Sequence, residues 1–321
     1  MRNIPVWRTI GSAYGFAFEN LATIIGLIWL PLTLLFVGEY FAVSRYLDSV
    51  LTALADGNRF AVYGGAGYLY LYRIAVLFLQ AIVAVPVMRQ AFGLRSKGAF
   101  VHFGLGLAEL RLFGAFVAFF LIVLTIEIAF LVVWVALAAG LTFGGNALGV
   151  VQGVSVPLVA AWTKSGLLFG LLAGLVYLSV RLSFFLVAVT VGEKRIDLIR
   201  CWTLTHGNFW RIFCVLVFVT VPTWLLYLAI QMAFVGVAAY SPATEFIPAA
   251  SQFGGNVRIA AGQMHRLLAW LPYVYGAWFL VQPLALGLSS GAAAAAYRAL
   301  VPAALAVSTP PADSPLPAVT S

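Results

Sequence analysis

Residues 112–138 read LFGAFVAFFLIVLTIEIAFLVVWVALA, and this stretch decides the fold class because Glu127 is its single charged residue. An α-helix needs an apolar run of about 20 residues to cross the hydrocarbon core of a bilayer. A membrane β-strand would instead alternate lipid-facing apolar residues with polar ones, and this run has no such alternation. The stretch is therefore predicted to be a transmembrane helix.

The composition of the whole chain leads to the same class. Of the 321 residues, 63% are hydrophobic and 9% are charged, whereas soluble domains average about 45–50% and about 25%. A soluble protein of this composition would expose apolar patches larger than water tolerates. The proportions exclude a soluble globular domain and predict an all-α integral membrane protein.

Six apolar runs long enough to cross a membrane follow one another along the chain. The predicted spans are Leu21–Phe41, Leu69–Met88, Leu112–Ala138, Gly166–Val189, Ile212–Val235 and Leu267–Leu288. The first is too long for the apolar region of a cleavable signal peptide, so we expect it to remain as an anchor. Residues 1–305 form the predicted membrane domain, and residues 306–321, rich in Pro, Ser and Thr, form a predicted disordered tail.

The positions of Lys and Arg predict the orientation, because cytoplasmic loops are enriched in these residues. With both termini in the cytoplasm, 11 of the 18 Lys and Arg residues fall on the cytoplasmic side, 6 fall on the other side, and Arg181 lies within a span. The cytoplasmic set comprises Arg2, Arg8, Arg89, Arg95, Lys97, Arg111, Lys194, Arg195, Arg200, Arg211 and Arg298. The net charge of +8 then suits anionic lipid head groups, and no basic run with interleaved aromatics indicates nucleic-acid binding.

Three cytoplasmic segments share one pattern, which begins in residues 6–21. An apolar stripe falls on one side of a helical wheel and polar residues on the other, as in a helix that lies on a membrane. The apolar stripe comprises Val6, Trp7, Ile10, Tyr14, Ala17, Phe18 and Leu21. The plan recurs at residues 96–113 and 194–213, at a period of roughly 90 to 100 residues. We expect three repeats, at about 1–92, 93–190 and 191–300, each an interfacial amphipathic helix followed by a transmembrane hairpin.

The third copy also carries a family resemblance. The stretch VRLSFFLVAVTVGEKRIDLIRCWTLTHGNFWRIFCVL, residues 180–216, resembles the repeating signature of a bacterial family of six-span membrane proteins. That family includes the membrane domain of glycerophosphoryl diester phosphodiesterases and the YciC-like inner-membrane proteins. The matching residues are Arg181, Gly192, Glu193, Trp202, Gly207, Asn208, Phe209, Trp210 and Arg211, and Glu109 and Arg111 resemble the counterpart in the middle repeat.

The resemblance implies a membrane module in the bacterial inner membrane. It does not extend to catalysis, because the phosphodiesterases carry a separate soluble barrel domain with metal-binding acids, for which this chain has no room. The residues themselves show no metalloprotease, nucleophile-elbow or phosphate-loop motif. Neither Cys201 nor Cys214 stands at a metal or redox spacing. We therefore predict a protein that is not an enzyme and that has no cofactor.

Two ionisable residues at membrane depth form a candidate polar site, since such residues are costly in hydrocarbon and are often functional. Glu127 lies in the third span and Arg181 in the fourth. One interpretation is an ion pair or a proton-carrying site between them. The alternative is that Arg181 reaches the cytoplasmic interface while Glu127 remains protonated or bonds to a polar neighbour.

Further candidate residues have roles in contact with lipid or helices. Gly166, Gly170 and Gly174 repeat at a spacing that lets another helix approach closely, so we predict helix packing there. The predicted lipid head-group contacts are Arg8, Lys97, Arg111, Lys194, Arg195, Arg200 and Arg211. Two functions follow. The first is a non-catalytic membrane module that binds lipids or a membrane protein partner. The alternative is a transporter of small solutes or ions with its site at Glu127 and Arg181.

Overall fold

The computed structural model of the protein describes residues 3–56, 61–94, 105–147, 166, 169–239 and 257–301, and every secondary-structure element in these ranges is helical. Residues 169–178 form a helix that continues directly into the π-helical turn η1. The labelled elements are α1 (Val6–Glu19), α2 (Leu21–Asp56), α3 (Ala61–Ala91), α4 (Leu107–Ala147), η1 (Ser179–Ser183), α6 (Phe184–Gly192), α7 (Leu198–Thr205), α8 (Phe209–Ala239) and α9 (Val257–Leu300).

Six helices are long and apolar enough to cross a membrane, which confirms the predicted number and order of the spans. Their apolar segments are Leu21–Val50, Gly67–Ala91, Leu107–Ala136, Phe169–Gly192, Phe209–Ala233 and Pro272–Leu300. The helices extend beyond the predicted bounds because local hydrogen bonds, not hydropathy, set their ends. At the start of α4, the backbone N–H of Gly106 donates to Oε2 of Glu109 at 3.0 Å, so the helix begins before the apolar run.

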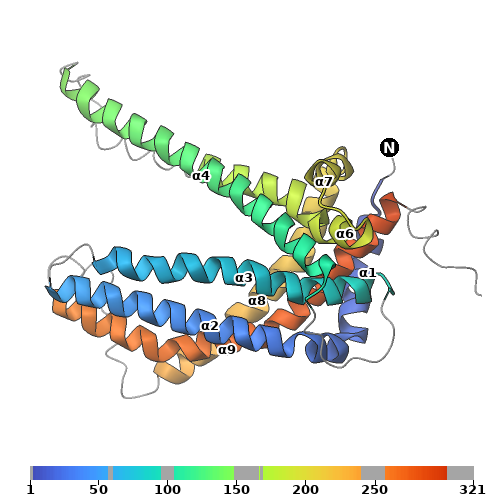
Figure 1. Ribbon diagram of the computed structural model, residues 1–321, viewed down its shortest axis with the longest axis horizontal. Coiled ribbons are helices and arrows are strands. Elements are labelled where there is room, and N and C mark those ends of the chain that lie inside the picture. Colours follow the sequence, from blue (N-terminus) through green and yellow to red (C-terminus); the bar gives the residue numbers. More distant parts are fainter. Residues whose placement is uncertain are drawn as a thin grey trace, which may run out of the picture.

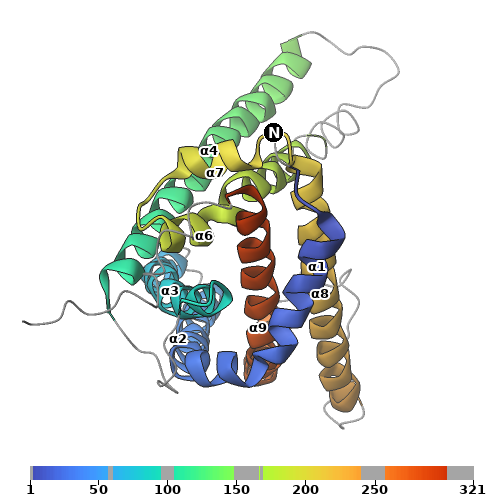
Figure 2. The same cartoon turned by 90° about the vertical axis from the view of Figure 1, so that its right-hand side faces the viewer.

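One end of every span meets the others in what we call the junction end, which is marked by Asn20, Ala91, Leu107, Gly192, Phe209 and Leu300. The opposite end of the bundle is called the far end. At the junction end, α1 and α7 lie across the direction of α2 and α3 (Figures 1 and 2). Helices α2, α3 and α9 run together, and α8 packs against α9 and α1.

Helix α4 leans away from this group, together with residues 169–178 (Figure 1). It contacts α3 and α6 near its N-terminus, and none of the most apolar window of its span is buried within the protein. The buried core instead sits at the junction end, where Met88, Phe185, Ile212 and Tyr297 are almost fully enclosed. The exposed apolar side chains of α4 are suited to hydrocarbon, which accepts them without the penalty they would incur in water.

Parts of the predicted threefold plan lie outside the described residues. Of the middle surface helix predicted at residues 96–113, residues 96–104 are among these, and Leu107–Phe113 form the first turns of α4 with no break before its span. The predicted tail, residues 306–321, also lies outside the described part. Helices α1 and α7 lie within the segments predicted as the first and third surface helices, residues 6–21 and 194–213, and the threefold repeat stays a prediction.

Candidate functional site

Helix α1 packs closely against α9 at the junction end. Ala13 and Ala17 of α1 are fully buried, and they face Gly287 and Gly291 of α9. A Cβ atom built on Gly291 would come within 3.1 Å of Cα of Ala13, and one on Gly287 within 3.3 Å of Cα of Ala17. Small residues four apart on both helices thus allow nearly direct backbone contact. The apolar stripe predicted for α1 is therefore divided, because Ile10 and Ala17 face protein while Trp7 and Phe18 remain exposed.

The glycine stripe predicted in the fourth span has no such partner among the described residues. A Cβ atom on Gly166, Gly170 or Gly174 would meet nothing within 4 Å. Spacing alone predicts the possibility of close approach, but the approach also needs a second helix with small residues opposite. The structure supplies that second helix at Gly287 and Gly291, which the sequence-based prediction missed.

An asparagine holds the turn between a short helix and the long helix that follows it at two places, after α1 and after α7. Asn20 follows α1, and its Oδ1 accepts a hydrogen bond of 3.0 Å from Nε2 of Gln90 at the end of α3. Asn208 precedes α8, is 3% exposed, and accepts a 3.2 Å hydrogen bond at Oδ1 from the backbone N–H of Ile4. Gly207 precedes it with a φ of +78°, a conformation in which a residue without Cβ is favoured. The N-terminal segment is therefore tied to the start of α8.

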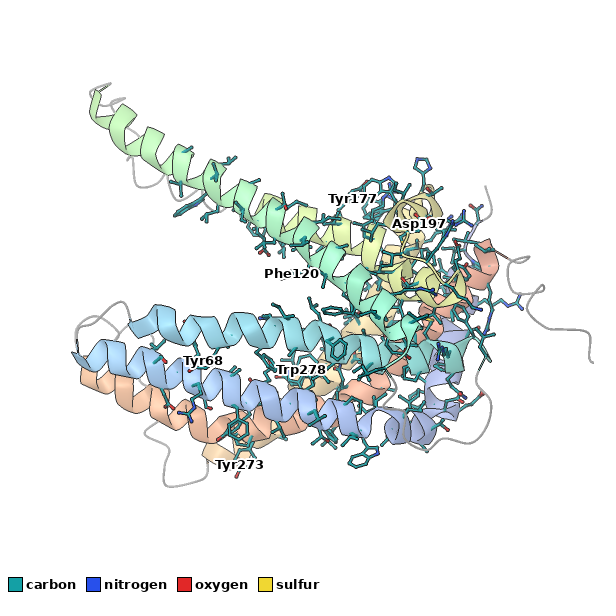
Figure 3. The ribbon with its side chains drawn as sticks, in the orientation of Figure 1. Tyr68, Phe120, Tyr177, Asp197, Tyr273 and Trp278 are labelled. Atoms are coloured by element: carbon teal, nitrogen blue, oxygen red, sulfur yellow. The ribbon has the colours of Figure 1, made fainter. Side chains whose placement is uncertain are left out.

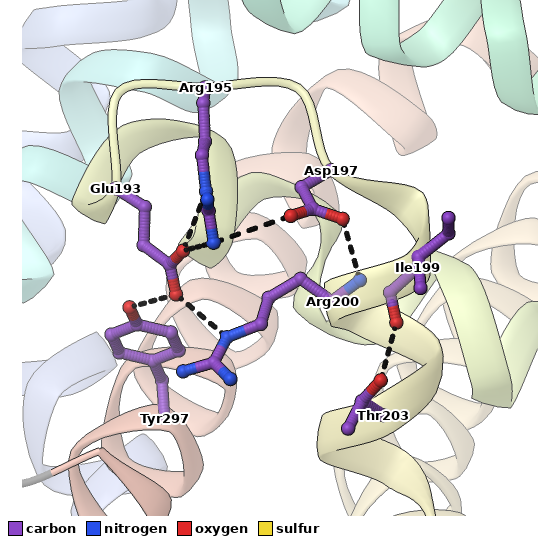
Figure 4. Close-up of polar contacts among 7 residues, drawn as sticks. All are labelled: Glu193, Arg195, Asp197, Ile199, Arg200, Thr203 and Tyr297. Carbon is purple, nitrogen blue, oxygen red and sulfur yellow. Dashed lines mark hydrogen bonds and ion pairs between the residues drawn. The ribbon is translucent and has the colours of Figure 1, made fainter.

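A charged cluster links the loop after α6 to the end of α9 (Figure 4). Oε1 of Glu193 accepts hydrogen bonds from the hydroxyl of Tyr297 at 3.0 Å and from Nε of Arg200 at 3.1 Å. Oε2 of Glu193 pairs with Arg195 at 2.7 Å, and Arg195 also reaches Asp197 at 3.3 Å. Asp197 caps α7 by accepting from the backbone N–H of Arg200 at 2.7 Å.

The electrostatics of this cluster follow from opposing effects on Glu193. Burial disfavours its charged form, but hydrogen bonds from Tyr297, Arg200 and Arg195 outweigh burial and hold the pKa of the carboxyl below its ordinary value. Close by, burial and the negative charges of Asp197 and Glu193 raise the pKa of the Cys201 thiol to about 12. Cys201 is fully buried, and a thiol that stays protonated is a poor nucleophile.

Arg181 lies at the junction end in the π-helical turn, where it is surrounded by aromatic rings. Its guanidinium carbon is 4.8 Å from the ring centroid of Trp202, 5.3 Å from that of Tyr177 and 5.9 Å from that of Phe209. Nε and Nη1 are buried and have no hydrogen-bond partner among the described residues. Cation–π attraction is thus the main interaction that the described part offers this charge. Tyr177 is labelled beside α7 in Figure 3.

The structure does not bring Glu127 and Arg181 together. Glu127 is exposed on α4, and the described residues show no ion pair between the two side chains. The sequence predicted both residues at membrane depth, but Arg181 lies among aromatic rings at the junction end and Glu127 is exposed on α4, which leans outward (Figure 1).

The predicted head-group residues have two kinds of surroundings. Arg8 and Lys194 are exposed, and Arg111 and Arg211 are half-buried at the starts of α4 and α8. Arg195 and Arg200 are instead drawn onto Glu193, as described above. Lys97 lies outside the described residues. Exposed aromatic and aliphatic side chains stand among these cations, and the most exposed are Trp7 at 73%, Ile199 at 81% and Trp210 at 72%.

A cavity lined by two arginines also lies at this end, between the first turns of α1 and the last turns of α9. Arg8 and Arg298 both line it. The cavity was not predicted, because the residues that line it are far apart in the sequence and form no local pattern. One signal was available, since GLSSG at residues 287–291 and AYGFA at residues 13–17 share a small-residue spacing that would have indicated α1 against α9.

Comparison of the chain with family models, with curated proteins and with solved structures found no match.

Proposed function

We propose that the protein is a non-catalytic, multi-pass module of the bacterial inner membrane that binds anionic lipid head groups at its junction end, with both termini in the cytoplasm. The observation that carries the proposal is the arrangement of α1 and α7 across the ends of the spans (Figure 2). Arg8 and Trp7 are exposed on α1, Trp202 is exposed on α7, and the cations Lys194 and Arg195 are exposed in the turn that precedes α7. Helices placed in this way lie at the level of the head groups when the spans cross a bilayer. Tryptophan is enriched at that level.

The charge distribution supports this orientation. Of the Lys and Arg residues in the described ranges, most belong to the junction end, whereas Arg45, Arg73, Arg258 and Arg266 belong to the far halves of α2, α3 and α9. The junction-end set comprises Arg8, Arg89, Arg111, Arg181, Lys194, Arg195, Arg200, Arg211 and Arg298. An excess of cations on one side is the usual mark of the cytoplasmic face. The resemblance to the six-span family of phosphodiesterase membrane domains agrees with such a role and stays a prediction.

The transporter alternative has less support. Its site required Glu127 and Arg181 to converge, and the described residues give them no common partner. A transporter site is expected where several polar groups converge near the bilayer midplane. A membrane protein partner remains the second kind of ligand for the junction end, and the outward lean of α4 leaves its apolar surface available to such a partner or to lipid.

Lipid selectivity tests the proposal directly. The purified protein is reconstituted in phosphatidylcholine vesicles, and brominated phosphatidylglycerol or brominated phosphatidylcholine is titrated in while tryptophan fluorescence is recorded. We expect the anionic lipid to bind at least about 2-fold more tightly, with the preference shrinking as salt screens the exposed cations.

Matched variants locate the preference. Lys194→Gln combined with Arg111→Gln removes two cations from the junction end and is expected to reduce the preference. Arg45→Gln combined with Arg73→Gln removes two from elsewhere and should leave it intact. Equal quenching by both lipids in the wild-type protein would overturn the proposal.

A further inference from the structure

The cavity between α1 and α9 has the features of an anion site. Its volume is about 470 Å³, and its polar lining consists of Asn3, Arg8, Thr9, Ser12 and Arg298. The remaining lining residues are Pro5, Ala295 and Ala299, so the described lining holds two cations and no carboxylate. The two positive charges beside this cavity repel each other. An anion between them would attract both and so offset that repulsion.

The hydrogen-bond donors of the lining are partly unused. Arg8 and Ser12 are exposed and make no hydrogen bond or ion pair with the described residues. Arg298 is held in place, because its Nη2 donates to the carbonyl of Ala91 and its guanidinium lies 5.7 Å from the ring centroid of Phe92. One cation is thus fixed in position by the end of α3, while the other remains free to close on a ligand.

The start of α1 adds to the positive potential. Pro5 precedes the helix and provides no side-chain hydrogen bond to the first turn. The unpaired N–H groups of a first helical turn, together with the helix dipole, favour an anion nearby. In α1 this turn borders the cavity that Arg8 and Arg298 line, so the helix start and two guanidinium groups all contribute positive potential to this cavity.

We propose that this cavity binds a phosphate group, with Arg8 and Arg298 as its charge partners and Ser12 as a hydrogen-bond donor. Arginine matches the geometry of phosphate oxygens with two parallel hydrogen bonds. The phosphate can belong to a lipid head group or to a soluble phosphate ester. The lipid source rests on the orientation in the proposed function, since only then does the cavity lie at the level of the head groups.

The experiment measures binding to the full-length protein in a non-ionic detergent by calorimetry. The probes are dioctanoyl phosphatidic acid, glycerol 3-phosphate and dioctanoyl glycerol, the last of which lacks the phosphate. Binding of phosphatidic acid alone supports a lipid head-group site, and binding of glycerol 3-phosphate as well supports a soluble phosphate ester. Wild-type protein that binds neither phosphate probe, or that binds dioctanoyl glycerol as tightly as phosphatidic acid, overturns the proposal.

Variants tie the binding to the cavity. Arg8→Gln removes the free cation, and Ser12→Asp places a negative charge in the lining. Each is expected to weaken binding by about 10-fold or more, since charge-assisted hydrogen bonds are the strong ones. The controls are Arg45→Gln, which removes an exposed cation from the far half of α2, outside the lining, and Gly11→Asp, which adds the same charge to an exposed neighbouring position of α1.

The two proposals fail in distinguishable ways. If Arg8→Gln and Ser12→Asp bind phosphate like their controls, the cavity is not the site, although the preference for anionic lipid around the protein can persist. If that preference is absent while both variants lose phosphate binding, the site stands and the lipid-interacting function falls.

Discussion

The hydroxyl of Tyr297, in the last turn of α9, donates a hydrogen bond of 3.0 Å to Oε1 of Glu193, in the turn that follows α6. Tyr297 is fully buried, and its ring packs against Phe92 at the end of α3, with 5.7 Å between the ring centroids. One side chain therefore joins the ends of three spans. Glu193 is held in turn by Arg195 and Arg200, so the contact connects the core to α7.

Removal of the hydroxyl should loosen this connection. Tyr297→Phe keeps the ring and deletes one donor to a charged carboxylate, so we expect a loss of about 1.5–3 kcal/mol in the free energy of unfolding. The readout is the apparent melting temperature in detergent. Tyr40→Phe is the control, because the Tyr40 hydroxyl makes no hydrogen bond with the described residues. Equal melting of both variants would contradict the assignment.

The depressed pKa of Glu193 makes stability depend on pH in one direction. The pKa of the carboxyl is lower in the folded protein than its ordinary value of 4.5. The stabilisation is therefore complete above pH 4.5 and is lost as the pH falls through the depressed folded-state pKa. Glu193→Gln should melt lower at neutral pH and lose less stability on acidification than the wild type, when both are followed from pH 7 to 3. Glu19→Gln, an exposed carboxylate at the end of α1, serves as the control.

Lys194 carries a strained backbone in the same turn. Its φ of +56° places a residue with a side chain in the left-handed region, which glycine occupies at no steric cost. We expect Lys194→Gly to raise the free energy of unfolding by about 0.5–1 kcal/mol. Lys194→Ala removes the same charge without relieving the strain, so it should not be stabilised. If alanine and glycine behave alike, the charge and not the backbone is responsible.

The close packing of α1 against α9 can be tested with a single bulky residue. Gly291→Leu would press a side chain into Ala13 and Phe16, whose atoms lie 3.0–3.2 Å from the position of a Cβ atom. Overpacking of this kind costs about 1–3 kcal/mol, which should lower the apparent melting temperature. Gly170→Leu is the matched control, because a Cβ atom there meets nothing within 4 Å. A larger loss at Gly170 would mean that the two glycine stripes have been assigned to the wrong roles.

Glu127 and Arg181 should behave as independent sites. They share no contact or common partner among the described residues, and residues without shared partners have additive effects to within about 0.5 kcal/mol. A double-mutant cycle with Glu127→Gln and Arg181→Gln, read by unfolding in detergent, measures the coupling. A coupling of several times that size would restore the ion-pair interpretation.

The sequence was sufficient for the spans but not for their contacts. Hydropathy located all six apolar helices because lipid exposure requires apolar residues along the whole length of a span, whatever its neighbours. Contacts such as Tyr297 with Glu193 join positions more than a hundred residues apart and leave no local pattern. Spacing rules were ambiguous for the same reason, because the stripes at Gly166–Gly174 and Gly287–Gly291 look alike until the small residues of α1 are found opposite one of them.

The pairing of Ala13 and Ala17 with Gly287 and Gly291 also constrains how the protein is made. Helix α1 leaves the ribosome before α9, with five of the described apolar helices between them in the chain, so it cannot reach its final position until those helices and α9 have been synthesised. At translation rates of about 5–20 residues per second, α1 waits for about 15 to 60 s before α9 arrives. During that interval Ile10, Ala13 and Ala17, which are buried in the folded protein, have no α9 to pack against, and the interfacial layer of a membrane can accommodate such apolar side chains.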